Sequence, residues 1–94
     1  MTRSVLTILN PLGLHARPAA KLVDCAARYT SDIRFSYGDQ EIDAKSIMSV
    51  LMLAAPCGAE LAVTIEGADE QAALQALQTL FSIGIFDYNL LPSD

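Results

Sequence analysis

The chain has 94 residues, of which 52% are hydrophobic, so it is long enough for one small domain with a single core and too apolar for intrinsic disorder. Its net charge of −5, from 11 acidic and 6 basic residues, argues against nucleic-acid binding, which depends on clustered Lys and Arg. The sequence has neither the ~20-residue apolar run of a membrane span nor the apolar segment of a secretory signal, so we expect a cytoplasmic protein without membrane association.

Hydrophobic periodicity predicts the elements of the first half of the chain. Apolar and β-branched residues favour a strand from Val5 to Leu9, and Asn10-Pro11-Leu12-Gly13 is a turn signal. Apolar residues spaced three and four apart predict a helix from about Ala16 to Arg28. Two short segments, Ile33 to Tyr37 and Gln40 to Asp43, are separated by a Gly-Asp break and predict an antiparallel pair of strands.

The same patterns continue through the second half. Ser46 is a good N-cap for a short helix from Ile47 to Leu53. Alternation from Leu61 to Ile65 predicts another strand, and Asp69 can cap a last helix that runs to about Ser82. The order is β-α-β-β-α-β-α, and the strands have one polar face. We therefore expect a single α+β domain, a two-layer open-faced sandwich whose helices cover one face of the sheet.

The only histidine, His15, lies where the first helix is expected to begin. Pro18 suits the first turn, where its missing N–H removes no hydrogen bond. The N–H groups of Ala16 and Arg17 lie at the positive end of this helix, which attracts anions, and the Arg17 guanidinium has the geometry to clamp a phosphate. A nucleophilic imidazole beside such a site indicates a histidine that carries a phosphoryl group. The alternative is a solvent-facing histidine at a helix cap, without function.

The sequence indicates no metal site or cofactor. Cys25 and Cys57 form no C-x-x-C motif, and we expect two unrelated reduced thiols. One histidine and two scattered cysteines do not supply the ligands of a structural zinc site.

Two segments of the chain carry a family resemblance. Gly13-Leu14-His15-Ala16-Arg17-Pro18-Ala19 resembles the active-site signature of HPr, the histidine phosphocarrier of bacterial phosphotransferase systems. Lys45-Ser46-Ile47-Met48 is similar to the HPr segment around a serine that a dedicated kinase phosphorylates. The resemblance covers residues 2 to about 85, so residues 86–94 form a C-terminal extension of a single domain spanning residues 1–94. It implies a four-stranded antiparallel sheet, order 1-4-2-3, with three helices on one face.

The resemblance also implies a function. His15 would accept a phosphoryl group, through Nδ1, from enzyme I that phosphoenolpyruvate has charged, and would donate it to enzyme IIA domains for sugar uptake or nitrogen-linked regulation. Such a carrier has no turnover of its own, although it counts as a transferase component, and we expect it to be a monomer. Leu12, Asp24 and Ala27 depart from the sugar-transport members, and Leu12 with Asn10 is similar to the nitrogen-branch relative NPr.

The short helix carries two further candidate sites. Ser46 resembles the regulatory serine of the family, phosphorylated by HPr kinase/phosphorylase, and the alternative is a plain N-cap. Because Val50 and Leu53 already supply an inward face, a second apolar set is expected to face outward as a docking patch: Ile47, Met48, Leu51 and Met52. The alternative is a helix buried on all sides.

Two other functions remain open at this stage. One is a regulatory HPr relative that binds proteins and is controlled by phosphorylation of Ser46. The other is an unrelated small α+β ligand-binding domain, which periodicity alone would indicate.

Overall fold

A computed structural model describes residues 1–9, 13 and 15–82 of the chain. These residues form strands and helices in the order β1 (Thr2–Thr7), α1 (Ala16–Ala27), β2 (Asp32–Tyr37), β3 (Gln40–Asp43), α2 (Ile47–Leu53), β4 (Glu60–Glu66) and α3 (Glu70–Ser82). The predicted element order is therefore confirmed. Most of the predicted turn at residues 10–13 and the predicted extension at residues 86–94 lie outside the described residues.

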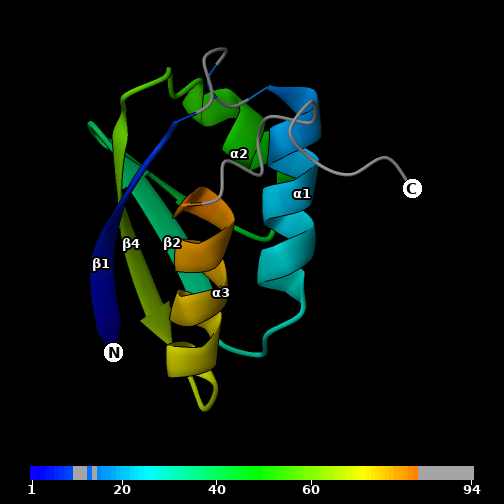
Figure 1. The fold of residues 1–94 in the computed structure, drawn as a ribbon, viewed down its shortest axis with the longest axis vertical. Coiled ribbons are helices and arrows are strands. Elements are labelled where there is room, and N and C mark those ends of the chain that lie inside the picture. Colours follow the sequence, from blue (N-terminus) through cyan, green and yellow to red (C-terminus); the bar gives the residue numbers. More distant parts are fainter. Residues whose placement is uncertain (10–12, 14, 83–94) are drawn as a thin grey trace.

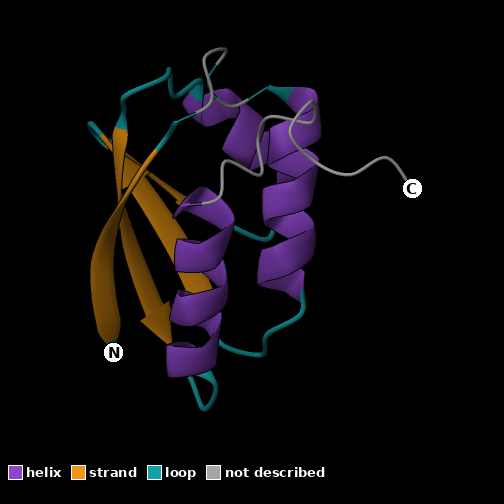
Figure 2. Cartoon of the chain, viewed as in Figure 1, coloured by secondary structure: helices purple, strands orange, loops and turns teal. Residues whose placement is uncertain are grey.

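The four strands form one antiparallel sheet with the spatial order β1-β4-β2-β3. All three helices lie on one side of this sheet, and no described element covers its other side (Figure 1). The two layers are seen edge-on when the ribbon is coloured by secondary structure (Figure 2). The α+β open-faced sandwich is confirmed, including the order 1-4-2-3.

The core lies between the sheet and the helices because alternate strand residues point inward. Ile33 and Phe35 of β2 are fully buried, and they pair across the sheet with Ile65 and Val63 of β4. The helices close the core with residues that are also inaccessible to solvent, among them Leu22, Val50 and Leu77. Truncating Leu22 or Leu77 to Ala would cost about 2–5 kcal/mol, so packing in this core contributes strongly to holding the helices on the sheet.

The predicted boundaries of β1 were wrong. We expected a strand from Val5 to Leu9, whereas the ladder runs from Thr2 to Thr7 and pairs with residues 60–65 of β4. The first residues of the strand are mostly polar, so the apolar pattern does not reveal where the strand begins. Their backbone groups nevertheless pair with β4, because backbone pairing does not require apolar side chains. Past the ladder, Ile8 remains buried, and its N–H donates to the Ala59 carbonyl oxygen at 2.9 Å.

A hydrogen-bonded junction ties the start of α3 to the segment between α1 and β2. The Asp69 carboxylate accepts from the Thr30 N–H at 2.8 Å, from the Ser31 N–H at 2.9 Å and from the Ser31 hydroxyl. Asp69 directly precedes α3, and its carbonyl oxygen accepts the Ala73 N–H at 3.0 Å, as expected for a residue that caps this helix. The sequence did not predict that its carboxylate reaches a loop 38 residues away. These donors lower the pKa of Asp69 to about 2.

The same junction requires a glycine. Gly67 has a φ of +157°, and a Cβ on this residue would lie 2.6 Å from the Ser31 Cα. Ser31 is the one buried polar residue among the described residues. The segment at Gly67 thus packs closely against a residue that is itself enclosed. The junction lies at the lower end of the molecule in Figure 1, opposite the end that holds the start of α1.

We predict that Asp69 makes the stability of the fold sensitive to acid. Because the carboxylate has a lower pKa in the folded state than its usual 3.8, its stabilisation is complete above that value and is lost as the pH falls towards about 2. The free energy of unfolding, measured by urea denaturation, should therefore fall more steeply between these pH values in the parent protein than in Asp69→Asn. Asp39→Asn, which removes a carboxylate from the β2–β3 turn, is the control and should keep the parent's slope. Equal slopes for all three proteins would contradict the assignment.

Candidate functional site

His15 is the N-cap of α1, as the sequence predicted. Its backbone is extended, with φ −115° and ψ −170°, and its carbonyl oxygen accepts the Ala19 N–H at 2.9 Å. The residue is half-buried, and its side chain makes no capping hydrogen bond to the helix. The imidazole is thus carried at the start of α1 without competing for the first-turn N–H groups.

The first turn of α1 combines a buried anchor with exposed donors. Pro18 and Ala19 are buried against the core, while Ala16 and Arg17 are exposed. Pro18 has no N–H, so the donors that this turn presents at its solvent side come from Ala16 and Arg17. The turn holds no acidic residue to neutralise the positive end of the helix dipole. This end of α1 therefore suits an anionic group.

Gly13 fixes the approach of the chain to His15. The residue is buried and has a φ of +71°, and a Cβ on it would lie 2.6 Å from the Ala55 oxygen and 2.9 Å from the Pro56 Cα. A side chain would meet backbone atoms that cannot rotate away, so only glycine fits. The sequence indicated a turn here but gave no sign of this contact.

The segment after α2 also forms hydrogen bonds with the residues that follow β1. The Gly58 N–H donates to the Ile8 carbonyl oxygen at 2.7 Å, and the Cys57 thiol donates to the Leu9 carbonyl oxygen with a sulfur–oxygen distance of 3.8 Å. Residues 55–59 therefore contact the chain on both sides of residues 10–12. Cys57 had no predicted role beyond that of a reduced thiol, and both cysteines are free thiols.

Helix α2 lies beside the N-terminal end of α1, and the two helices contact each other (Figure 1). The Ser46 hydroxyl caps α2 by accepting the Ser49 N–H at 3.4 Å, which confirms its predicted N-cap position. Lys45, the residue before it, donates from Nζ to the Tyr29 carbonyl oxygen at 2.6 Å and so ties the start of α2 to the end of α1.

Three of the four predicted patch residues are exposed. Ile47, Met48 and Met52 expose 36%, 65% and 71% of their surfaces. Leu51, which we also expected to face outward, is half-buried and packs against the core, because α2 contacts both α1 and β3 and so buries more than one side of the helix. The exposed patch on α2 therefore consists of Ile47, Met48 and Met52.

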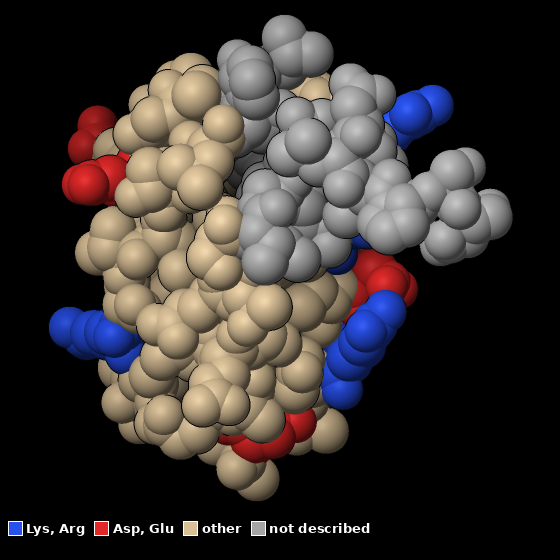
Figure 3. Space-filling view, in the orientation of Figure 1, with Lys and Arg blue, Asp and Glu red and all other residues tan. Residues whose placement is uncertain are grey.

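Charge around α1 is mixed. Arg17 and Lys21 are exposed basic residues near its start. Towards its end, Asp24 accepts a hydrogen bond from Arg28 at 2.9 Å, in a pair too exposed to add much stability. On the face drawn in Figure 3, the charged side chains among the described residues lie mainly towards the margins. Two of the six basic residues of this chain, Arg17 and Lys21, thus lie in the first turns of the helix that follows His15.

Cys25 lies on α1 without a connection to the site. Burial raises the pKa of its thiol above the usual value, which outweighs the opposing effect of Arg28. The thiol form is therefore favoured, as in a structural cysteine rather than a reactive one. Within the described parts of the chain, no group of three or more potential ligands could hold a metal ion, and no helix is long and apolar enough to cross a membrane.

Comparison with known proteins decides the family. Residues 2–82 match the family model described as "PTS HPr component phosphorylation site". The chain belongs to the HPr family of phosphocarriers. The proteins of this family carry a histidine phosphorylation site and serve the phosphotransferase system.

Named relatives agree with this membership. The chain is 46% identical over 81 residues to the phosphocarrier protein HPr of Treponema pallidum, covering 86% of this chain and 92% of the relative. It is 47% identical over 81 residues to HPr of Xylella fastidiosa, covering 86% and 91%. Residues 83–94 lie beyond the family match.

Solved HPr structures have the same fold. A crystal structure of HPr-C-His from Thermoanaerobacter tengcongensis superposes with a TM-score of 0.88 at 34% identity and covers 93% of this chain and 98% of that one. HPr from Bacillus anthracis gives a TM-score of 0.80 at 35% identity, with 85% and 95% coverage. The alternative of an unrelated small α+β domain is therefore wrong.

We predict that Gly13→Ala damages the site by displacing the chain before His15. The positive φ and the contact with residues 55–56 together should lower the free energy of unfolding by about 2 kcal/mol, measured by urea denaturation. Gly58→Ala is the matched control, since its φ of +88° is also positive but nothing lies within 4 Å of the added Cβ. This control should lose only about 1 kcal/mol. Equal losses in the two variants would show that the close contact is unimportant.

Proposed function

We propose that His15 is the residue of this chain that accepts and donates the phosphoryl group. The observation that carries the proposal is its position: His15 immediately precedes the exposed residues Ala16 and Arg17 at the positive end of α1, whose first turn holds no acidic residue. In the reaction, an imidazole nitrogen of His15 forms a bond to phosphorus as the phosphorus–nitrogen bond of phosphorylated enzyme I breaks. The donor imidazole leaves with the electron pair of that bond. Transfer to an enzyme IIA domain reverses the role of His15.

The start of α1 supplies what this reaction needs. Phosphoryl transfer depends mainly on positioning and on stabilising charge that spreads over the phosphoryl oxygens. The N–H groups of Ala16 and Arg17 present fixed partial charges to these oxygens. The Arg17 guanidinium adds a full positive charge and a planar fork that matches two oxygens. By its resemblance to the family, we assign the reacting nitrogen as Nδ1.

The exposed patch on α2 is the proposed docking surface for the protein partners. Ile47, Met48 and Met52 are exposed on α2, which lies beside the N-terminal end of α1, so one partner surface can cover both the patch and the start of α1. Methionine side chains adapt to different shapes, which suits a carrier that meets enzyme I and IIA domains in turn. Such contacts must be short-lived, which agrees with a small apolar patch.

The pathway that this carrier serves is a separate question. Sugar uptake and nitrogen-linked regulation both use this chemistry, and the chain carries departures from the transport members at Leu12, Asp24 and Ala27. Of these, Asp24 forms an ion pair with Arg28 and so offsets its positive charge on α1. We therefore propose partners that require less basic charge along the later turns of α1.

Ser46 supports a second, regulatory function. Its hydroxyl lies at the N-cap of α2 and the residue is partly accessible, next to the exposed patch. A phosphate at a helix N-terminus is electrostatically favourable, so the domain would stay folded when modified. The added negative charge would instead repel an acidic partner. HPr kinase/phosphorylase is the proposed source of this modification.

We predict that His15→Ala abolishes phosphorylation by phosphoenolpyruvate, enzyme I and Mg²⁺. The parent protein should form an acid-labile adduct, detected as a mass increase, and the variant should form none because it lacks the nucleophile. Arg17→Lys keeps the charge but loses the fork, so its transfer rate should fall roughly tenfold with little change in stability.

Ser46→Ala serves as the control in this assay and should form the acid-labile adduct at the parent's rate. No adduct on the parent protein, or an adduct that survives in His15→Ala, would refute the assignment. An acid-stable adduct that needs ATP and a kinase, and that disappears in Ser46→Ala, would establish the regulatory function.

We predict that Met48→Asp slows phosphorylation by enzyme I without destabilising the fold. A charge in the middle of an apolar contact remains desolvated in the complex, so the transfer rate at low protein concentration should fall roughly tenfold. Gln75→Asp adds the same charge at an exposed position of α3 and should transfer at the parent's rate. Equal rates in the two variants would place docking elsewhere.

A further inference from the structure

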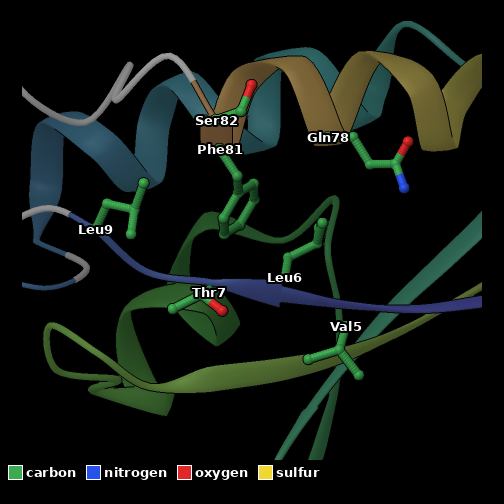
Figure 4. Close-up of a pocket in the computed structure, with 7 residues that line it drawn as sticks. All are labelled: Val5, Leu6, Thr7, Leu9, Gln78, Phe81 and Ser82. Atoms are coloured by element: carbon green, nitrogen blue, oxygen red, sulfur yellow. The ribbon is translucent and has the colours of Figure 1, made fainter.

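An apolar groove lies between β1 and the C-terminal turn of α3 (Figure 4). It has a volume of about 340 Å³ and is lined by Val5, Leu6, Thr7, Leu9, Gln78, Phe81 and Ser82. The Phe81 and Leu6 side chains approach each other between helix and strand, and Leu9 lies beyond the end of β1. No part of the proposed phosphoryl transfer uses this groove.

The groove adjoins an open sheet edge. In the described sheet, β1 is an outer strand that pairs with β4 alone. Along this edge Val5 and Leu9 expose 58% and 54% of their surfaces. Edge strands are usually blunted by proline or by several charged residues, whereas β1 carries only Arg3. The edge is therefore suited to receive one more strand.

The chain itself supplies a segment of suitable chemistry. Ser82, the last described residue, lines the groove, and residues 83–94 follow it directly in the sequence. Within them, Phe86-Asp87-Tyr88-Asn89-Leu90 alternates strictly between apolar and polar, the pattern of a strand with one buried face. Gly84 lies between this segment and α3, where the chain would have to reverse.

We propose that residues 86–90 add to the open edge of β1 as a fifth strand and set Phe86, Tyr88 and Leu90 against the groove. The direction follows from α3, which runs along β1. At its start, Glu70 accepts a hydrogen bond from the Thr2 hydroxyl, and at its end Phe81 and Ser82 lie with Thr7 and Leu9. A chain that turns back after α3 therefore runs antiparallel to β1.

Length and tethering favour this segment over a second copy of the protein. Five residues match the six of β1, and three residues separate them from α3. A tethered segment acts at an effective concentration of roughly millimolar. Two separate chains instead lose translational and rotational entropy when they associate. A stable dimer usually buries about 1,200 Å² or more, so a second copy would need contacts beyond the seven residues that line the groove.

The test compares full-length variants by NMR and amide hydrogen exchange. In the parent protein, the Tyr88 ring should show nuclear Overhauser contacts with the methyl groups of Val5 or Leu9. Tyr88→Lys places a charge on the apolar face of the segment, so the β1 amides that face away from β4 should exchange roughly tenfold faster. Asn89→Lys makes the same change of charge on the polar face and should exchange like the parent.

Three outcomes would overturn the proposal. The first is a parent protein without contacts between Tyr88 and the groove. The second is equal exchange in the parent and both variants. The third is protection of β1 that disappears on dilution, which would identify a second copy as the occupant. Because none of these measurements involves phosphorylation, the proposal stands or falls independently of the role of His15.

Discussion

The close backbone approach between Gly13 and residues 55–56 determines the arrangement of the whole candidate site. It joins the chain that leads into α1 to the chain that leaves α2, so the two helix ends cannot move independently. Helix α2 is held in turn by Val50 and Leu53 in the core, and α1 by Pro18 and Ala19. The imidazole of His15 and the exposed patch on α2 thus belong to one rigid part of the molecule.

The interactions that stabilise the opposite end of the fold are of a different kind. There, the Asp69 carboxylate and the backbone of Gly67 hold the segment at Ser31 through hydrogen bonds and close packing. This junction is remote from the start of α1, at the other end of the helices (Figure 1). The first turn of α1, at the other end, holds no acidic residue and takes no part in this junction.

Much of the fold followed from periodicity, because the strands alternate and the helices carry apolar stripes that face the core. His15 could be placed at a helix start from Pro18 and the spacing after it. The contacts that involve distant segments could not be predicted in this way. Nothing local shows that Gly13 meets Ala55, or that Asp69 binds Ser31 rather than only capping α3.

Two further differences have the same origin. The polar start of β1 pairs through its backbone, which side-chain patterns do not register. Leu51 was expected to face outward and is half-buried because α2 contacts two neighbouring elements, α1 and β3, which its own sequence does not reveal.

The role of Pro18 has a consequence for energetics. A first turn that lacks one N–H can form only a few hydrogen bonds to a phosphoryl group. A phosphoryl group that is weakly stabilised in this way keeps most of its free energy of transfer. In the proposed relay, weak stabilisation makes phosphoryl transfer reversible. The carrier therefore equilibrates with its partners and does not retain the phosphoryl group.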